Sequence, residues 1–318
     1  MVHPVGPGPA QLVLTAAVAR RYYLDNRSKL EIANELGLSR FKVARLLEAA
    51  RASGLVRIEI GLPGVLDVEL SGRVQDIFGT THAVVIDAPD DDDPALRTEL
   101  GRAAAQLLQE IVTNDDVLGL TWARSVSAMA AELTRLPAVP VVQLTGALTR
   151  TDVDESSVEL VRRVARVSNG PAHYFYAPMI VSDAATAHAL RHQPEVASCF
   201  GRFGGVTVAV VGIGAWAPGQ STVHDALGSA ERADLAARGV CAEVAGAVLD
   251  VDGKLLDTSL AERLIGVTGA QLQHVPLVVG VPYGRAKAVA VRASLRSGIV
   301  GALVTHSSLA LELLALGP

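Results

Sequence analysis

Residues 119–125 combine, within one short stretch, the groups that bind a phosphate. An apolar run ends there, and a hydroxyl, a cation and the start of a predicted helix follow in the order Gly-Leu-Thr-Trp-Ala-Arg-Ser. Free backbone N–H groups at a helix start attract anions, and a nearby cation adds to that attraction. The same residues also fit an ordinary strand-to-helix turn with a serine cap. The side chains concerned are Thr121, Trp122, Arg124 and Ser125.

Two further stretches place polar groups or glycines where a predicted strand ends. Residues 143–146 read Gln-Leu-Thr-Gly, and residues 212–216 read Gly-Ile-Gly-Ala-Trp. Ligands of open α/β sheets collect at the carboxyl ends of the strands, so all three stretches are candidate binding elements. The third glycine of a dinucleotide fingerprint is missing from residues 212–216, which argues against a nicotinamide site. The sequence therefore predicts no cofactor.

Residues suited to acid–base chemistry are scattered along the chain. The candidates are His224 with Asp225, Glu243 and Lys287, and no Gly-x-Ser-x-Gly, His-Glu-x-x-His or Walker lysine motif accompanies them. We expect His224 and Asp225 to lie in a solvated loop and Lys287 to lie on the surface of a helix. The sequence thus favours binding over catalysis, and we assign no catalytic residue.

The composition limits the class of protein. Half of the 318 residues are hydrophobic, enough for a large core in one to three domains. Two cysteines are too few for a disulfide framework or a metal cluster, and the acidic run 90–93 has no other ligands nearby, so we predict no metal site. Neither a membrane-length apolar run nor a secretory signal is evident, and we expect a cytoplasmic protein without a membrane partner.

Residues 28–47 have the pattern of a helix-turn-helix. Ser28 and Glu31 form a capping box in sequence, Gly37 can end a first helix in the left-handed conformation, and Ser39 can cap a second. Apolar residues recur at helical spacing in both segments, and a small alanine allows the helices to cross closely. In such a motif the second helix enters the DNA major groove. An ordinary helical hairpin is the alternative.

The distribution of charge supports the DNA-binding interpretation. Residues 1–60 hold nine basic and five acidic side chains, a net charge of +4, whereas the remainder holds 19 basic and 28 acidic ones, a net charge of −9. In a regulator only the DNA-binding segment contacts the DNA phosphates, so we expect a basic N-terminal segment followed by an acidic remainder. The residues predicted to face the groove are Ser39, Arg40, Phe41, Lys42 and Arg45.

The remaining chain divides by its periodicity. We expect a disordered tail over residues 1–10, a DNA-binding domain over 11–62, a linker helix over 63–79 and an α/β domain over 80–318. Within the DNA-binding domain we expect a first helix at 11–24 and a wing strand at 55–60. Apolar strands alternate with helices in that last part, which predicts a mostly parallel sheet covered on both faces. The predicted strands are 82–86, 117–121, 139–144, 173–176, 206–212, 276–281 and 302–305.

Taken together, the motifs closely resemble those of SorC-type transcriptional regulators, a group that includes the deoxyribonucleoside and central glycolytic gene regulators. In the DNA-binding segment the resemblance rests on residues 31–58. In the remainder it rests first on residues 119–125, which are similar to the family's Gly-x-[Ser/Thr]-Trp-Gly-Arg-Thr loop. It continues in order through 143–146, 177–181, 211–214, 239–246, 252–253, Lys287 and 298–305, and it covers about residues 11–316.

The resemblance implies a winged helix-turn-helix joined to a Rossmann-like domain that is similar in fold to sugar-phosphate isomerases and deaminases but serves as a sensor. It further implies a homo-oligomer, a dimer or tetramer, that binds double-stranded operator DNA under the control of a phosphorylated sugar. By position, Arg124 and Ser125 would hold the phosphate, Thr121 and Trp122 would shape the loop, and Lys287 would meet the phosphate or an anionic end. The sugar itself would contact Gln143, Thr145, Gly146 and Glu243.

The chain departs from the family pattern at three places. Ala123 stands where a glycine is usual, residues 242–244 read Ala-Glu-Val where many members have Gly-Asp-Ile, and residues 306–308 read His-Ser-Ser in place of Asp-Glu-Ala. Independently of these departures, two alternatives stay open: a sugar-phosphate isomerase or deaminase with an appended DNA-binding head, and an architectural DNA-binding oligomer without an effector.

Overall fold

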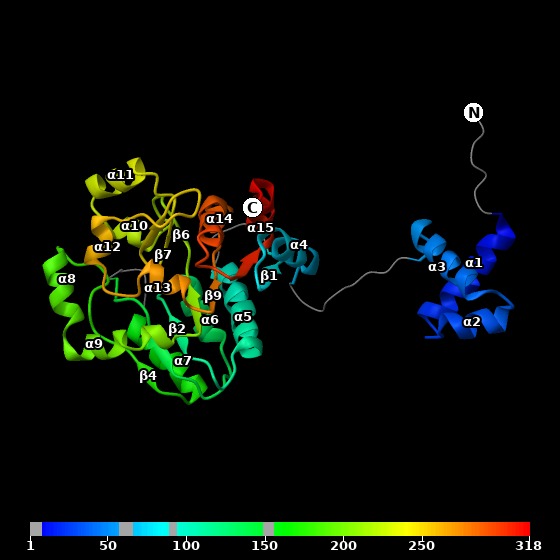
Figure 1. Ribbon diagram of the computed structural model, residues 1–318, viewed down its shortest axis with the longest axis horizontal. Helices are drawn as coiled ribbons and strands as arrows, with labels where there is room; N and C mark the ends of the chain where they lie inside the picture. Colours follow the sequence, from blue (N-terminus) through cyan, green and yellow to red (C-terminus); the bar gives the residue numbers. More distant parts are fainter. Residues whose placement is uncertain (1–7, 57–65, 89–93, 149–155) are drawn as a thin grey trace. The chain divides into compact units, whose positions relative to one another are not determined.

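A computed structural model describes residues 8–56, 66–88, 94–148 and 156–318. The chain divides into two compact units, Met1–Leu62 and Pro63–Pro318 (Figure 1). Each unit has its own hydrophobic core, and each is described below by itself.

The smaller unit is a bundle of three helices, α1 (Pro9–Tyr23), α2 (Lys29–Leu36) and α3 (Arg40–Ala52). The predicted capping box is confirmed: the Glu31 amide donates to Ser28 Oγ at 3.3 Å, and the Ser28 amide donates to Glu31 Oε2 at 2.8 Å. Gly37 ends α2 with a φ of 64°, a conformation that a glycine adopts without strain. The buried core of the unit consists of Val18, Ala19, Ile32, Ala33, Val43, Leu46, Leu47 and Ala50.

The predicted start of the first helix needs correction, and most of the predicted wing strand lies outside the described residues. Helix α1 begins at Pro9 and not at residue 11, because proline is well suited to the first helical position, where no N–H is required. The predicted tail 1–10 therefore overlaps the helix, and residues 1–7 lie outside the described residues. Most of the predicted wing strand 55–60 also lies outside them, and its described part, Leu55 and Val56, is not in a strand.

The larger unit is built on a seven-stranded parallel sheet in the order β1-β10-β9-β5-β2-β3-β4. Each of its strands overlaps one of the seven predicted segments, which confirms the predicted parallel α/β fold; β4 begins one residue before its segment and shares only His173 with it. The smaller antiparallel sheet β6-β7-β8 is absent from the prediction. The strands are β1 (His82–Ile86), β2 (Leu118–Leu120), β3 (Val141–Gln143), β4 (Ala172–His173), β5 (Val208–Val211), β6 (Gly214–Ala215), β7 (Ala242–Val244), β8 (Ala247–Leu249), β9 (Leu277–Gly280) and β10 (Ala302–His306).

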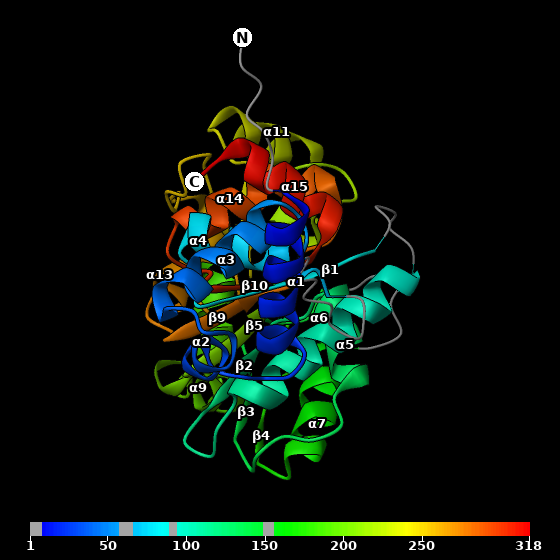
Figure 2. The ribbon, with the colours of Figure 1, turned by 90° about the vertical axis from the view of Figure 1, so that its right-hand side faces the viewer.

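Helices cover both faces of the parallel sheet (Figure 2). One core lies between the sheet and α5 (Pro94–Ile111), α6 (Arg124–Glu132) and α7 (Ser157–Ser168). The other core includes α4 (Val68–Phe78) and most of the remaining helices. Those remaining helices are α8 (Ala184–Arg191), α9 (Pro194–Phe200), α10 (Thr222–Ala226), α11 (Ser229–Ala237), α12 (Ser259–Arg263), α13 (Gly269–Gln273), α14 (Ala288–Arg296) and α15 (Ser307–Leu316), with short 3₁₀ turns η1 (Phe203–Gly205) and η2 (Arg285–Lys287).

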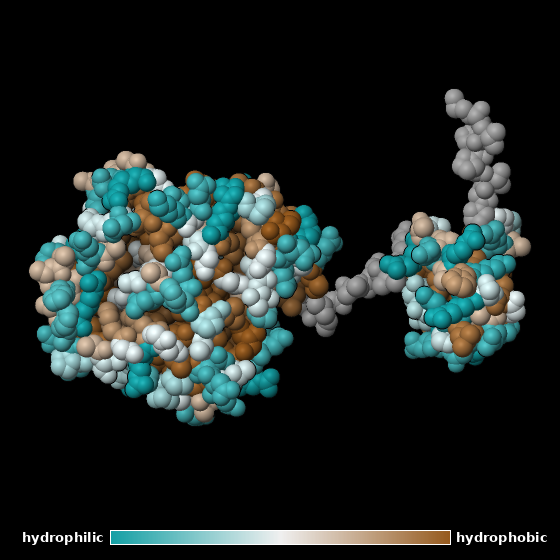
Figure 3. All heavy atoms as spheres, in the orientation of Figure 1, coloured by the Kyte–Doolittle hydropathy of each residue, from teal (hydrophilic) through white to brown (hydrophobic). Residues whose placement is uncertain are grey.

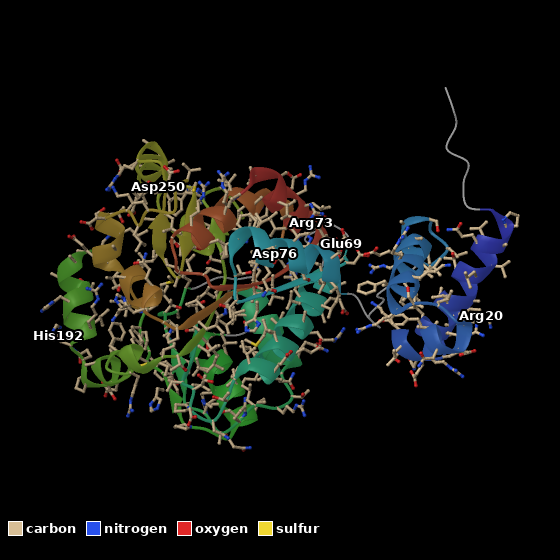
Figure 4. All side chains as sticks on the ribbon, turned by 45° about the vertical axis from the view of Figure 1, so that its right-hand side comes forward. Arg20, Glu69, Arg73, Asp76, His192 and Asp250 are labelled. Carbon is tan, nitrogen blue, oxygen red and sulfur yellow. The ribbon has the colours of Figure 1, made fainter. Side chains whose placement is uncertain are left out.

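Helix α4 is the described part of the predicted linker helix 63–79. Asp67 caps its start, where Oδ1 accepts from the Leu70 amide at 2.9 Å, and Gly79 ends it with a φ of 65°. Leu70 and Val74 are buried against β1 and α15, so the apolar face of α4 packs within the larger unit. The charged side chains Glu69, Arg73 and Asp76 lie on its solvent-exposed side (Figure 4).

Candidate functional site

A cavity of about 240 Å³ opens at the carboxyl ends of β2, β5 and β9, which are neighbours in the parallel sheet. Residues from three turns line it: the turn between β2 and α6, the turn after β5, and the turn that joins β9 to η2. The β7–β8 hairpin and the start of α10 close another side. Seven of the nine predicted effector-binding residues line this cavity: Thr121, Trp122, Arg124, Ser125, Thr145, Glu243 and Lys287.

The turn after β2 presents the start of α6 to the cavity. Ala123 is the N-cap residue and contributes no side-chain cap, so the dipole of this nine-residue helix ends at the cavity wall. The buried hydroxyls hold neighbouring strand ends: Ser125 Oγ donates to the Val281 carbonyl at 2.6 Å, and Thr121 Oγ1 donates to the Val210 carbonyl at 3.3 Å. This leaves the amides at the start of α6 and the Arg124 guanidinium as the groups of the turn best suited to an anion.

The turn after β9 adds two further cations, Arg285 and Lys287. Gly284 precedes them with a φ of 88°, a backbone conformation that favours glycine. Lys287 Nζ donates to the Ile213 carbonyl at 3.1 Å and lies 5.0 Å from the centre of the Tyr283 ring. The expectation that Lys287 is an ordinary surface lysine was therefore wrong.

Sequence reasoning missed Arg285 as a cavity residue. The signal was available, because Arg285 follows a predicted strand that ends at residue 281 and so lies at the same edge of the sheet as residues 119–125. A cation placed shortly after a strand end and a glycine is a candidate in any fold of this class.

Glu243 forms the acidic wall of the cavity and is only 7% exposed. Its Oε1 accepts from Ser221 Oγ at 2.9 Å, and its Oε2 accepts from the Gly246 amide at 3.1 Å. Burial raises the pKa of the Glu243 carboxyl above its ordinary value, although these two hydrogen bonds and the charge of Lys287 act in the opposite direction. A carboxyl in this position suits hydroxyl groups of a ligand.

Gln143 and Gly146, the other two predicted effector-binding residues, do not line the cavity. Gln143 is buried, and its Nε2 donates to the Thr145 carbonyl at 2.9 Å and to Ser157 Oγ at 3.1 Å. A side chain on Gly146 would come within 2.7 Å of the backbone of Met179. Gln143 thus holds Thr145 in place, and Gly146 allows two chain segments to approach closely.

His224 is buried and not solvated, which corrects the loop predicted for this stretch. It lies in α10, where its Nδ1 is 3.0 Å from Asp225 Oδ1 and its ring meets the Trp216 ring edge to face. The Asp225 carboxylate also accepts from the Gly219 amide at 3.1 Å. These contacts fix the segment that carries the cavity residues 219–223.

Three cations and one carboxyl group give the lining its electrostatic character. Arg124, Arg285 and Lys287 come from the turns after β2 and β9, and Glu243 comes from β7. Charge-assisted hydrogen bonds from such cations are stronger than neutral ones and favour phosphate or carboxylate ligands. The arrangement therefore suits a ligand that has both an anionic group and hydroxyls.

The predicted groove-facing residues lie on the exposed side of α3. Ser39 caps the helix, where its Oγ accepts from the Lys42 amide at 3.2 Å. Arg40, Lys42 and Arg45 are exposed, and Phe41 is 85% exposed although it is aromatic. Exposed cations on a helix that follows a tight turn can contact both phosphates and base edges.

Within the described ranges, the helices and the metal-ligating side chains bear on a membrane or metal-binding role. No helix there is long and apolar enough to cross a membrane. No cluster of three or more His, Cys, Asp or Glu side chains there is arranged to hold a metal ion, and the two cysteines, Cys199 and Cys241, are free thiols.

Comparisons with known proteins agree with this architecture. Residues 65–315 match the family model described as "Putative sugar-binding domain". The transcriptional regulator LsrR of Klebsiella pneumoniae is 29% identical over 311 residues, which is 96% of this chain and 94% of LsrR. The sorbitol operon regulator of Klebsiella pneumoniae is 24% identical over 300 residues, with 92% and 95% covered. The crystal structure of full-length SorC from the same organism superposes with a TM-score of 0.73 at 24% identity, covering 96% of this chain and 99% of that one.

Proposed function

Because the chain belongs to the sugar-binding domain family of SorC-type transcriptional regulators, we propose that it binds operator DNA through α3 and a phosphorylated sugar in the cavity of the larger unit. The observation that carries the proposal is the lining of this cavity. Three cations and the start of α6, which has no side-chain cap, lie at the carboxyl ends of β2 and β9, the two strands that flank β5 in the sheet. The buried carboxyl group of Glu243 lines the same cavity.

The phosphate is assigned to the cationic turns. The amides at the start of α6 and the guanidinium groups of Arg124 and Arg285 hold its oxygens, and Lys287 meets its charge or a second anionic end. Thr145 and Glu243 contact the sugar hydroxyls, while Thr121 and Trp122 shape the turn. Ser125 contributes through its backbone, because its hydroxyl proton is already donated to Val281.

The DNA site is assigned to the smaller unit, with Ser39, Arg40, Phe41, Lys42 and Arg45 in the major groove. A palindromic operator requires two such helices, so the functional protein is a homo-oligomer. Apolar side chains that remain exposed on α4 and α15, among them Val68, Ile77 and Leu311, offer surface for contacts between copies (Figure 3). The protein acts on DNA in the cytoplasm.

A binding assay on the DNA upstream of the chain's own coding sequence tests the proposal. Both tryptophans serve as reporters of the cavity, because Trp122 lines it and Trp216 packs on His224. We expect a sugar phosphate from a panel of glucose 6-phosphate, fructose 6-phosphate and ribose 5-phosphate to change both the tryptophan fluorescence and the affinity for DNA. Unphosphorylated sugars should do neither at the same concentration.

Substitutions in α3 separate the two sites. Arg40→Ala or Arg45→Ala should weaken specific DNA binding by about 1–3 kcal/mol while leaving the fluorescence response intact. Arg20→Ala is the matched control, since Arg20 is an exposed cation of α1 outside the recognition helix (Figure 4). DNA binding by both α3 variants equal to that of the wild type would refute the recognition-helix assignment. Unchanged DNA affinity with every sugar phosphate would favour an architectural protein.

Arg285 provides a direct test of the phosphate assignment. Arg285→Gln removes one charge-assisted hydrogen bond, for which we expect a loss of about 1.5–3 kcal/mol in sugar-phosphate affinity, measured by fluorescence titration. Arg166→Gln on α7 removes an exposed arginine that does not line the cavity and should have no effect. Equal affinities for the two variants would contradict the assignment of Arg285.

A further inference from the structure

The turn that carries Arg285 and Lys287 is anchored to the end of strand β10. His306 is the last residue of β10 and is fully buried, and its Nε2 accepts a 3.0 Å hydrogen bond from the Gly284 amide. The preceding residue makes a second bond to this turn, because Thr305 Oγ1 donates to the Pro282 carbonyl at 3.1 Å. The end of β10 therefore fixes the backbone immediately before the two cavity cations.

The same end of β10 also holds strand β1. His306 lies opposite Ile86 in the parallel register of β1 and β10. Ser307, which begins α15, donates from its Oγ to the Ala88 carbonyl at 3.3 Å. The ends of the two strands are therefore bound to each other through consecutive residues.

Strand β1 in turn binds the first described residues of the larger unit. Leu66 forms an antiparallel bridge with Ile86, and the Asp67 amide donates to the Val85 carbonyl at 2.8 Å. The Val85 amide donates to Ser71 Oγ in α4 at 2.9 Å. The start of α4 is thus held by the strand that His306 borders.

We propose that His306 is the positioning residue that couples occupancy of the cavity to the start of α4, the helix that follows the smaller unit in the sequence. The inference rests on the proposed function, because it requires a ligand that binds Arg285 and Lys287. A shift of the turn at Gly284 passes through the hydrogen bond to His306, then to Ile86, and then to Leu66. Coupling of this kind requires that both ligands prefer particular arrangements of the same element.

Two substitutions separate the hydrogen bond of His306 from its packing. His306→Gln keeps a side-chain acceptor of similar reach, whereas His306→Met fills similar space without a strong acceptor. Ser168→Ala is the matched control, because Ser168 is also buried and its Oγ donates to the Val139 carbonyl near the β3–β4 edge of the sheet. It loses a buried hydrogen bond without touching the path from Gly284 to Leu66.

Hydrogen exchange in the full-length chain measures the coupling. Peptides covering residues 66–78 and 282–287 are followed with and without glucose 6-phosphate, fructose 6-phosphate or inorganic phosphate, and binding is monitored by tryptophan fluorescence. We expect a bound probe to change the exchange rate of both peptides by about threefold or more in three proteins: the wild type, the His306→Gln variant and the Ser168→Ala variant. In His306→Met only residues 282–287 should respond. Without a probe, residues 66–78 should exchange about threefold faster in the Met variant than in the Gln variant.

The outcomes distinguish the coupling from the proposed function. An α4 response in His306→Met equal to that of the wild type, at the same saturation, would overturn the role of His306. If no probe changes the tryptophan fluorescence of the wild type, the sugar-phosphate site itself fails. The probe-free comparison then still tests the path from His306 to α4, because equal exchange of residues 66–78 in the Met and Gln variants would show that the His306 hydrogen bond does not hold the start of α4 and would overturn its positioning role.

Discussion

Glu243 shows how much of a cavity residue's chemistry depends on its neighbours. Its Oε1 accepts from Ser221, which ties the β7–β8 hairpin to the start of α10, and its Oε2 accepts from the Gly246 amide within the hairpin. A side chain on Gly214 would come within 2.4 Å of Oε1, so a glycine is required where β6 passes the carboxyl group. Glu243, which we propose contacts the ligand, is therefore also a structural part of the cavity wall.

The raised pKa of Glu243 predicts a particular dependence of stability on pH. The folded protein binds the Glu243 proton more tightly than the unfolded chain does, so the contribution to folding is full below the unfolded value of about 4.5 and is lost as pH rises through the folded pKa. Relative to Glu243→Gln, the wild type should therefore lose unfolding free energy as pH rises from 4.5. Urea unfolding of both proteins across this range measures it. Parallel curves would contradict the raised pKa.

At the scale of elements, the turns after β2 and β5 are fitted to each other. Ala123 stands where the resembled family usually has glycine, and its backbone is extended, with a φ of −156°, so no glycine is needed for conformation. The space for its methyl group comes from Gly212, where a side chain would lie 2.6 Å from the Ala123 Cβ. The departure at residue 123 is thus accommodated by the neighbouring turn.

This fit predicts the outcome of exchanging the two side chains. Gly212→Ala alone should cost about 1–3 kcal/mol of unfolding free energy through overpacking. The double variant Ala123→Gly with Gly212→Ala should recover most of that loss, as measured by urea unfolding. Gly228→Ala is the control, since nothing lies within 4 Å of the added methyl and the φ of −67° suits alanine. A double variant no more stable than Gly212→Ala would show that the two turns are not in contact as described.

At the scale of the whole molecule, the chain separates two kinds of recognition into two units. The first 60 residues carry an excess of basic residues, and the remainder carries an excess of acidic ones. Each unit has its own buried core. Under the proposed function, the phosphates of DNA and the phosphate of a sugar are therefore bound by different folds with different local charge.

The division predicts that a ligand stabilises mainly its own unit. At about 100 times its dissociation constant, a bound sugar phosphate should raise the unfolding free energy of the larger unit by about 2.7 kcal/mol. The slowest-exchanging amides of β5 report on the larger unit and those of α1 on the smaller one. Equal protection of α1 and β5 by the sugar phosphate would contradict the assignment of its site to the larger unit alone.

The sequence by itself determined the features that depend on neighbours along the chain. The capping box at Ser28, the turn glycine at Gly37 and the seven strands of the parallel sheet follow from local hydrogen bonding and from apolar periodicity. Strands β6 and β7 read Gly-Ala and Ala-Glu-Val, and glycine, alanine and glutamate are depleted in strands, so the smaller sheet was not predicted.

Only the tertiary structure decided which side chains meet. The order β9-β5-β2 brings Arg285 to the same cavity as Arg124, although about 160 residues separate them, and no local pattern encodes that order. The orientation of a polar side chain is also set by its surroundings: Gln143 turns into the core to bind Thr145 and Ser157, and His224 is buried against Trp216. Local sequence states which groups are available, whereas packing determines whether their hydrogen bonds serve a ligand or the fold.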